Sequence, residues 1–319
     1  MSILVTGANG QIGSELVGTL SETDRVIASD LASPSSASRT TAPDGIVFEK
    51  LDVTDRDGLH AVTEKYGIHT IYHLASLLSV TGEKNPDRAW DVNVNGLKHV
   101  LDLARARGLK VFWPSSIAVF GRATPAGRAP QTTILDPSTI YGVTKVSGEF
   151  LCRYYCEHFG VDVRSLRYPG LISYRTPPGG GTTDYAVKIL TAAAEGTPYE
   201  CFVGPETQLP MMYMPDAIRA AIELMHANPG FISVRTSYNV SAVSFTVGQL
   251  IDAVRARVPD FDIAYRPDRR QRIADSWPRD VDDRRAREDW GWRPKFDLNA
   301  MVDDMLAHLA PERSSVPNA

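Results

Sequence analysis

The sequence predicts an α/β protein, with a doubly wound parallel sheet followed by a smaller C-terminal α/β lobe. Three observations carry this prediction. A strand, a glycine-spaced turn and an amphipathic helix open the chain at 3–20. Short apolar strands then alternate with helical patterns as far as Arg167. After Tyr168 the rhythm changes to helices separated by short strands. Such alternation is typical of a parallel sheet covered by helices on both faces.

The opening turn has the form of a dinucleotide cradle. The strand 3–5 precedes it, and apolar residues at helical spacing follow over 12–20. Gly7 permits the tight turn, Gly10 lets the backbone approach a pyrophosphate, and Gly13 lets the helix pack close to the strand. The helix N-terminus presents free N–H groups to the phosphates. A tight turn without a ligand is the alternative, which the position directly after the first strand disfavours. The predicted contacts are Gly7, Asn9, Gly10, Gln11, Ile12 and Gly13.

The ends of the next strands predict the remaining cofactor contacts. Asp30 ends the second strand (Val26–Asp30), twenty residues after Gly10, where a carboxylate accepts hydrogen bonds from ribose hydroxyls and repels a 2′-phosphate. This favours NAD over NADP, the alternative being an ordinary polar strand end. After a third strand (Ile46–Glu49), Asp52 is placed to meet the adenine edge, and Thr54 is expected to cap a helix through Tyr66. The predicted contacts at these ends and after the fourth strand are Asp30, Leu31, Asp52, Val53, Leu74, Ala75 and Ser76.

The order of the later elements sets the predicted domain boundaries. Residues 1–168 form the nucleotide-binding core, 169–310 form mainly the second lobe with some segments returning to the first, and 311–319 form a polar tail. The first part continues with strands Thr70–Leu74, Lys110–Pro114 and Asp162–Arg167 and with helices Pro86–Arg107 and Ile140–His158. The second part is expected to hold helices Thr182–Glu195, Pro215–His226 and Thr246–Val258 and strands Tyr199–Val203, Ser237–Val240 and Asp262–Tyr265.

A serine, a tyrosine and a lysine form the predicted catalytic set. Tyr141 and Lys145 are four residues apart, so they share one helix face. An ammonium beside a phenol favours the phenolate, which would accept a proton from a substrate hydroxyl. Ser116, at the end of the fifth strand, would hold the substrate oxygen. Taken alone, the tyrosine and lysine would be a surface tyrosine packed on a lysine stem, but their place after a strand-end serine in a nucleotide-binding chain favours the catalytic interpretation.

Composition excludes several classes of protein. The net charge of −4 gives no basic field, which argues against a nucleic-acid partner. No apolar run reaches membrane-spanning length, and Met1 leads directly into the first strand without a signal peptide. The three cysteines and seven histidines show no metal-ligand spacing, so no metal is expected and the thiols are expected to be reduced in the cytoplasm.

Four motifs resemble the extended short-chain dehydrogenase/reductase superfamily, in particular its sugar-nucleotide epimerase branch. They are 6–13 (TGANGQIG), 93–96 (NVNG), 115–121 (SSIAVFG) and 141–145 (YGVTK). The resemblance runs from residue 1 to about 310 and implies an NAD-binding Rossmann domain and a small C-terminal substrate-binding lobe. By position, it gives Ser116 the serine role, Tyr141 the acid/base role and Lys145 the ribose-binding role. Asn93 matches a position that supports the active-site helix, and Phe120 stands where epimerases often have tyrosine. The resemblance also implies a homodimer formed through a helix pair that includes the Tyr141 helix.

A second glycine run narrows the resemblance to the short-chain type of L-threonine 3-dehydrogenase. The segments 168–173 and 178–187 look like that type, as does the run from Asp275 to Trp292, although Arg284 stands where serine is expected. The resemblance implies oxidation of L-threonine to 2-amino-3-ketobutyrate, with NAD as cofactor. From the residues, Gly179–Asp184 is a flexible loop whose N–H groups suit a small carboxylate, and it enters a capped helix. The implied substrate and cofactor contacts are Ser79, Asn93, Ser116, Tyr141, Lys145, Tyr168, Gly180, Thr182, Asp184 and Trp277.

Two other functions stay open on the sequence. A sugar-nucleotide 4-epimerase would use the same catalytic residues but keep NAD tightly bound and need a longer pocket. A non-catalytic NAD sensor would be expected to lack Tyr141 or Lys145, and both are present. The loops 79–85 and 179–184 are expected to close over the substrate.

Overall fold

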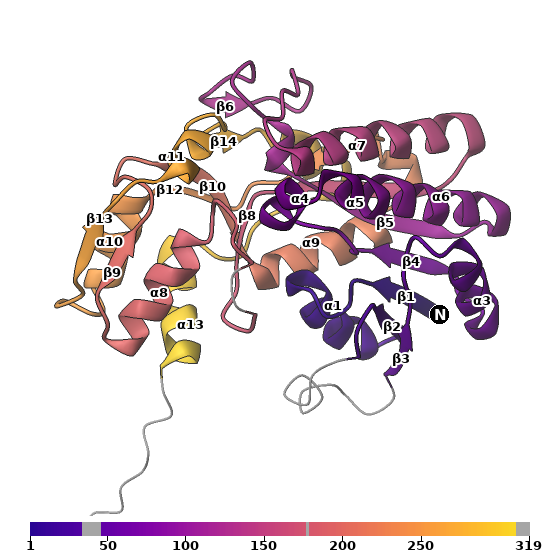
Figure 1. Cartoon of the computed structure of the whole chain (residues 1–319), viewed down its shortest axis with the longest axis horizontal. Coiled ribbons are helices and arrows are strands. Elements are labelled where there is room, and N and C mark those ends of the chain that lie inside the picture. Colours follow the sequence, from indigo (N-terminus) through magenta and orange to yellow (C-terminus); the bar gives the residue numbers. More distant parts are fainter. Residues whose placement is uncertain (34–45, 177–178, 311–319) are drawn as a thin grey trace, which may run out of the picture.

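A seven-stranded parallel sheet forms the first lobe, and smaller sheets with helices form the second (Figure 1). The computed structural model describes residues 1–33, 46–176 and 179–310. The strand order β11-β7-β5-β4-β1-β2-β3 is doubly wound, because the chain adds strands first on one side of β1 and then on the other. The predicted Rossmann fold is confirmed. The strands are β1 (Ser2–Thr6), β2 (Arg25–Asp30), β3 (Val47–Lys50), β4 (Thr70–His73), β5 (Lys110–Ser116), β7 (Val163–Tyr168) and β11 (Tyr238–Asn239).

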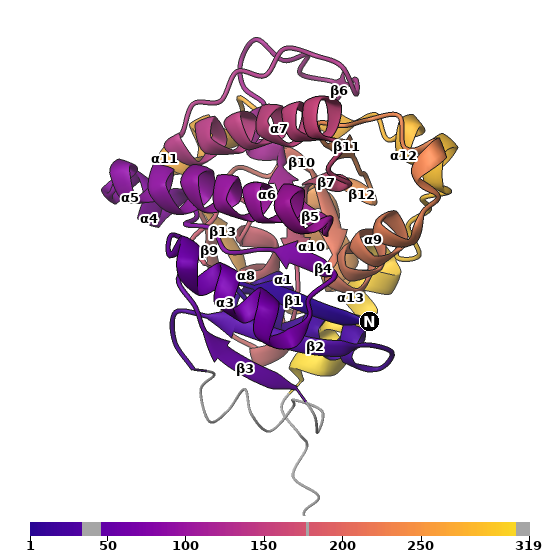
Figure 2. The ribbon, with the colours of Figure 1, turned by 90° about the vertical axis from the view of Figure 1, so that its right-hand side faces the viewer.

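Helices cover both faces of this sheet, because successive strand residues point to opposite sides. Ile3 and Val5 of β1 join a core with α1 and α9, whereas Leu4 joins another core with α3, α6 and α7. Figure 2 shows α6 and α7 side by side on one side of the sheet and α9 on the other. These helices are α1 (Gln11–Ser21), α3 (Arg56–Tyr66), α6 (Gly96–Arg107), α7 (Ile140–Phe159) and α9 (Met214–His226).

Three local expectations need correction. Asp55, not Thr54, caps α3: its carboxylate accepts the N–H of Gly58, whereas the Thr54 hydroxyl donates to Asp52. The helix expected over 86–107 consists of α5 (Pro86–Trp90), the π-helical turn η1 (Asp91–Asn95) and α6. Residues 79–84 form a short helix, α4 (Ser79–Lys84), instead of a loop.

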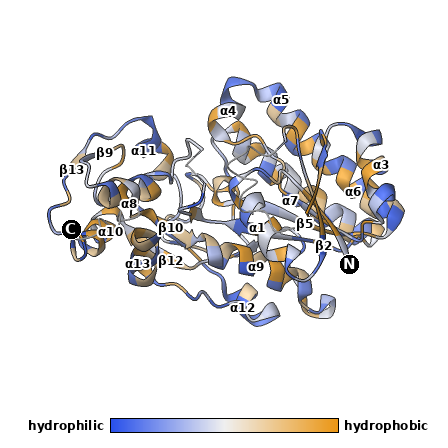
Figure 3. Ribbon diagram, turned by 90° about the horizontal axis from the view of Figure 1, so that it is seen from below, coloured by the Kyte–Doolittle hydropathy of each residue, from blue (hydrophilic) through white to orange (hydrophobic). Residues whose placement is uncertain are grey.

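The second lobe packs around its own core of α8, α10, α13 and a three-stranded sheet in the order β12-β10-β8. Its helices show hydrophilic and hydrophobic residues side by side, as amphipathic helices on a core do (Figure 3). The elements outside the large sheet are β8 (Gly170–Ile172), β9 (Tyr199–Cys201), β10 (Gln208–Tyr213), β12 (Val243–Thr246), β13 (Ile263–Tyr265), α8 (Tyr185–Glu195), α10 (Val247–Arg255), α11 (Arg269–Ala274), α12 (Arg284–Trp290), α13 (Leu298–Leu309), η3 (Pro229–Phe231) and the pair β6 (Arg128–Ala129) and β14 (Asp280–Val281).

Two segments expected in the second lobe pack on the first. The strand expected at Ser237–Val240 is β11, which pairs with β7 at the edge of the large sheet. Helix α9 covers that sheet beside α1. The local patterns of these two segments do not show which core they join. The polar tail and Pro177–Pro178 lie outside the described residues, as does most of the loop expected at 31–44. None of the helices in the described ranges is long and apolar enough to cross a membrane.

Candidate active site

A cavity of about 250 Å³ lies at the carboxyl ends of the parallel strands, between the two lobes. Ligands bind at this edge of doubly wound sheets. Residues far apart in sequence meet here, and both glycine runs contribute to its wall. The predicted site residues that line it are Gly7, Gly10, Gln11, Ile12, Gly13, Leu74, Ser76, Ser79, Ser116, Tyr141, Lys145, Tyr168, Gly180, Thr182, Asp184 and Trp277.

The opening turn is shaped for a phosphate group. Gly7 has φ +71°, and a Cβ there would lie 2.6 Å from the backbone N of Ala75. A Cβ on Gly13 would lie 2.3 Å from the carbonyl oxygen of Gly7. Gly10, the N-cap of α1, makes no side-chain cap, and the first turn has no acidic residue. The positive end of the helix dipole is therefore left for an anion, and the turn fits a pyrophosphate.

Asp30 lies at the end of β2, outside the enclosed part of the cavity. Its carboxylate accepts the backbone N–H of Asn9 at 3.0 Å and that of Leu31 at 2.7 Å. The Asn9 side chain donates to the carbonyl of Ala32 at 2.6 Å. These bonds fix one carboxylate beside the glycine turn, where it fits ribose hydroxyls better than a phosphate.

Asp52 also lies outside the cavity lining, with the adjacent Val53 buried. One carboxylate oxygen of Asp52 accepts the N–H and hydroxyl of Thr54, and the other accepts the Arg88 guanidinium at 2.9 Å. An adenine amino group would have to share these oxygens. Seven of the predicted contacts do not line the cavity: Asn9, Asp30, Leu31, Asp52, Val53, Ala75 and Asn93.

Asn93 supports the site from behind. It lies in the π-helical turn η1 and is buried. Its amide nitrogen donates to the carbonyl of Leu77 and to the hydroxyl of Thr144, both at 3.0 Å, and its oxygen accepts from Ser76 and Leu77. All its polar atoms are used within the protein, so Asn93 holds α7 to the loop after β4 and does not line the cavity.

Ser116, Tyr141 and Lys145 come together at the cavity. The Lys145 ammonium donates to the carbonyl of Pro114 at 2.7 Å and lies 5.5 Å from the centre of the Tyr141 ring. Burial lowers the pKa of Lys145 to about 7. Burial raises the pKa of Tyr141 to about 12, and the Ser116 hydroxyl beside it opposes that rise. Burial thus favours the protonated phenol, and the expected ionisation of Tyr141 by Lys145 together with an oxidised nicotinamide stays a prediction.

Two buried polar groups behind this set were not predicted. His73 ends β4, bonds to the Thr6 hydroxyl at 2.8 Å through Nδ1, and has no partner for Nε2 among the described residues. Glu149, two helical turns after Tyr141, accepts two bonds from Arg167, at 2.8 and 2.7 Å, and one from Ser115 at 2.7 Å. The signal was available, since a glutamate on the apolar face of a helix and an arginine inside a strand require a buried partner.

The second glycine run differs from expectation. The N–H groups of Gly180 and Gly181 both donate to Oδ2 of Asp184 at 2.6 Å, so they are not free for a carboxylate ligand. Helix α8 begins at Tyr185, and Asp184 caps it without a side-chain bond to its first turn. Among the described residues, Oδ1 of Asp184 makes no hydrogen bond. Burial raises the pKa of Asp184, which these two bonds oppose.

Several residues that were not named as individual contacts also line the cavity, at or near strand ends and within or beside the two loops expected to cover the substrate. They are Leu78, Val80, Pro114, Ser115, Ile117, Ala118, Pro169, Gly170, Leu171, Gly179, Gly181 and Thr183.

Comparison with known proteins agrees with this architecture. The NAD dependent epimerase/dehydratase family matches residues 3–241. The chain belongs to this family. An uncharacterized epimerase/dehydratase of Staphylococcus haemolyticus is 46% identical over 308 residues, covering 95% of this chain and 96% of the relative.

Solved structures of L-threonine dehydrogenases are also similar. The holo form of the GalE-like enzyme from Cupriavidus necator is 53% identical, with a TM-score of 0.93 over 97% of this chain and 100% of that one. The apo form of the same enzyme gives a TM-score of 0.81 over 96% of this chain and 99% of that one. The apo form of a monomeric L-threonine 3-dehydrogenase from a metagenome is 48% identical, with a TM-score of 0.91 over 97% and 98% of the two chains. The predicted membership of the extended short-chain dehydrogenase/reductase group is confirmed.

Proposed function

We propose that this protein oxidises L-threonine at Cβ, with NAD, to 2-amino-3-ketobutyrate. One observation carries the proposal: Ser116 and Tyr141 share a cavity of about 250 Å³ with Thr182, Asp184 and Trp277. A hydroxyl-binding pair on one wall and a loop with amino-acid-binding groups on the other suit a small β-hydroxy amino acid. The names of the similar solved structures agree with this substrate.

The cofactor assignment rests on the geometry of the first lobe. The glycine turn would hold the pyrophosphate, Asp30 the adenosine ribose, and Lys145 the nicotinamide ribose. Bound NAD⁺ supplies the acceptor for the hydride that leaves Cβ. A carboxylate fixed by two backbone N–H groups would repel a 2′-phosphate, so NAD is preferred over NADP.

The catalytic step belongs to Tyr141. The Ser116 hydroxyl holds the substrate hydroxyl, and the Tyr141 phenolate accepts its proton. Burial raises the pKa of Tyr141 to about 12, so the phenolate forms only when positive charge lies beside it. Lys145, on the same helix face, supplies such a charge when protonated, and burial brings its pKa to about 7. Ionisation of Tyr141 is thus coupled to the charge of Lys145 and of the occupied site.

Residues of the second glycine run bind the charged groups of the substrate. Oδ1 of Asp184 faces the ammonium group, while Oδ2 holds the loop through Gly180 and Gly181. Thr182, which is buried, donates to the carboxylate. Trp277 packs against the β-methyl group. Ser79 closes the cavity from the first turn of α4.

The test is NADH formation with L-threonine, D-threonine, L-allo-threonine and L-serine, each with NAD and with NADP. L-Threonine with NAD is expected to give the highest rate. No activity on L-threonine with either cofactor would refute the proposal. Conversion of a UDP-sugar without added NAD would instead favour the epimerase.

We also propose that the chain forms a homodimer through α5 and α7. Four large apolar side chains on these helices are exposed: Trp90 (42%), Val143 (38%), Phe150 (46%) and Tyr154 (48%). Most of them border a surface hollow of about 540 Å³, as do Arg153 and Glu157. Such a patch is typical of an interface, and an antiparallel second α7 would set each arginine opposite a glutamate.

Light scattering after gel filtration tests this interface. The wild type is expected to be a dimer and Phe150→Glu a monomer. Phe231→Glu is the matched control, since Phe231 is 67% exposed outside this patch. A monomeric wild type, as one similar enzyme is described, would refute the interface.

A further inference from the structure

A short ladder joins the segment that carries Trp277 to the first lobe. In this β6–β14 ladder, Asp280 and Val281 pair in parallel with Arg128 and Ala129. Arg279 N–H donates to the carbonyl of Ala126 at 2.9 Å, Asp280 N–H to that of Gly127 at 3.0 Å, and Asp282 N–H to that of Ala129 at 2.8 Å. Trp277 lies three residues before this pairing, so its backbone is anchored on a loop of the first lobe.

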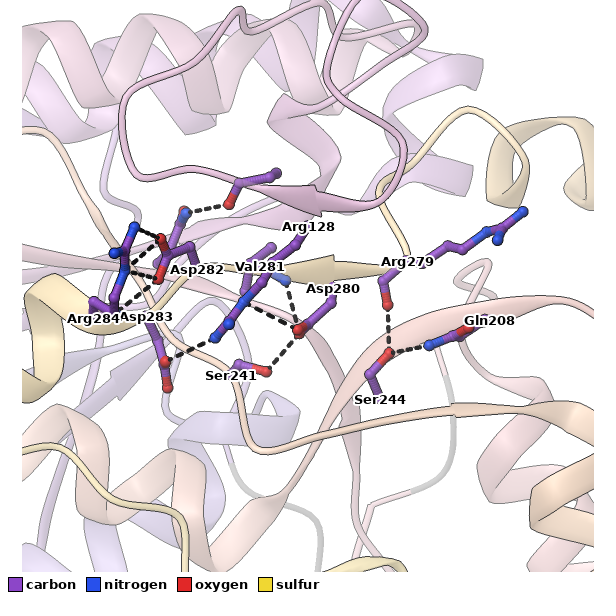
Figure 4. A network of polar contacts seen from close by, with 12 residues as sticks. Arg128, Gln208, Ser241, Ser244, Arg279, Asp280, Val281, Asp282, Asp283 and Arg284 are labelled. Carbon is purple, nitrogen blue, oxygen red and sulfur yellow. Dashed lines mark hydrogen bonds and ion pairs between the residues drawn. The ribbon is translucent and has the colours of Figure 1, made fainter.

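The side chains of Arg128, Ser241 and Ser244 contact the ladder and the segment beside it (Figure 4). Arg128 Nε lies 3.3 Å from one oxygen of Asp280, and its Nη2 lies 3.7 Å from the buried carboxylate of Asp283. The other oxygen of Asp280 accepts the Ser241 hydroxyl at 3.0 Å. The Ser244 hydroxyl donates to the carbonyl of Arg279. Both lobes therefore hold the same short segment.

A small apolar cluster lies beneath the ladder. Val281 and Ala129 are fully buried there with Phe120 and with Ile117 of the turn η2 (Ile117–Val119). Trp277 packs against the same cluster and also against the core of the second lobe. Ile117 directly follows Ser116, so one cluster supports both the residue proposed to hold the substrate hydroxyl and the one proposed to contact its methyl group.

We infer that the β6–β14 ladder is the element that positions Trp277 relative to Ser116, with Val281 and Arg128 as positioning residues that set selection for the substrate's β-methyl group. The inference rests on the proposed oxidation of L-threonine. Neither residue lines the cavity, so both act through Trp277. A binding wall keeps its geometry only when packing and polar contacts behind it lock its side chains.

Val281→Ala removes two methyl groups from the cluster and lets Trp277 move. The KM for L-threonine is expected to rise about tenfold, since small misplacements at a site have large effects. The preference for L-threonine over L-serine in kcat/KM is expected to fall by a similar factor, because a methyl contact provides about ten- to 200-fold discrimination. The dissociation constant of NAD is expected to stay unchanged. Arg128→Gln is expected to raise the KM two- to threefold at most, since Arg128 is half exposed.

Two matched variants separate positioning from stability. Val302→Ala is the same truncation at a fully buried position in the core of the second lobe, against which Trp277 also packs, so it compares that core with the ladder as the support of Trp277. Arg284→Gln removes a more exposed arginine, paired with Asp282 in the same segment. Both are expected to keep the wild-type preference for L-threonine over L-serine.

The inference is overturned if Val281→Ala and Val302→Ala change that preference equally, or if neither changes it. Should Val281→Ala fail to fold, Arg128→Gln and Asp280→Asn decide, and a wild-type preference in both overturns the inference. A wild type that does not oxidise L-threonine refutes the proposed function itself, which is a distinct outcome.

Discussion

The two glycine runs of this protein both lead into helices but differ in the hydrogen bonds made there. Residues 7–13 lead into α1 and form its first turn, which has neither a side-chain cap nor an acidic residue. Residues 179–184 precede α8, and the N–H groups of Gly180 and Gly181 are already bound to Asp184. The first run leaves the N-terminus of α1 available for an anion, although Asn9 N–H is bound to Asp30 and Gly10 N–H to Gly7. The second run is a loop closed on its own carboxylate. Glycine content therefore predicts a turn, but only the side chains nearby determine what the turn binds.

The largest expected effect on catalysis comes from a substitution of Tyr141, which lines the same cavity as both runs. Tyr141→Phe removes the proton acceptor while leaving both runs intact, so kcat is expected to fall about 10³-fold. NAD affinity is expected to remain, which isothermal titration measures. Near-normal oxidation of L-threonine by this variant would show that Tyr141 is not the proton acceptor.

The first glycine run, residues 7–13, is expected to be less tolerant of added side chains than the second. In Gly13→Ala the new Cβ would lie 2.3 Å from the carbonyl oxygen of Gly7, so α1 must shift. A loss of about 2 kcal/mol of stability and at least tenfold weaker NAD binding are expected.

Gly18→Ala in the same helix is the control, because its Cβ would meet nothing within 4 Å. It is expected to be neutral or slightly stabilising. Thermal unfolding and NAD titration measure both variants, and equal behaviour would mean that the close approach at Gly13 does not shape the cradle.

In the second glycine run, residues 179–184, substrate binding is expected to depend on the charge of Asp184. Asp184→Asn keeps an oxygen for Gly180 and Gly181 but loses the negative charge, whereas Asp184→Ala loses both. If Oδ1 binds the ammonium group, both variants raise the KM for L-threonine, by about tenfold or more, and leave NAD binding unchanged. A wild-type KM in Asp184→Asn would reduce Asp184 to a residue that only holds the loop.

Local patterns predicted most of the first lobe, because each strand and helix there carries its own periodicity. The glycine turn, Asp30 and the helix with Tyr141 and Lys145 could all be located from spacing. Assignments that depend on tertiary contacts were less successful. Nothing local in Tyr238–Asn239 shows that β11 pairs with β7, and a hydroxyl at Thr54 does not show that Asp55 caps α3.

Most of the predicted site residues line one cavity, but the electrostatics of that cavity could not be predicted from the sequence. A tyrosine and a lysine on one helix face suggest a lowered phenol pKa, whereas burial, which the sequence does not show, raises the pKa of Tyr141. The internal bonds of Asp184 likewise required coordinates, because the sequence cannot say which acceptor reaches two glycine N–H groups first.

The last expected effect concerns the pH dependence of stability, and its sign differs between the two regions. Burial lowers the pKa of His73, behind the cofactor side, to about 3, from 6.5. Between these values the unfolded chain binds a proton that the folded protein does not, so this residue makes stability fall as pH drops below 6.5. The loss amounts to about 2 kcal/mol between pH 6.5 and 5. Burial raises the pKa of Asp184 on the substrate side, which gives the opposite slope at lower pH.

His73→Asn keeps a polar partner for Thr6 and is expected to flatten this acid loss, seen as a smaller drop in Tm between pH 6.5 and 5. His69→Asn, at an exposed position one residue before β4, is expected to follow the wild type. If His73→Asn and the wild type lose stability in parallel, His73 accepts a proton in the folded protein. The buried Nε2 of His73 would then have a hydrogen-bond partner, and the surroundings of His73 and Lys145 would be less apolar than the contacts of the described residues indicate.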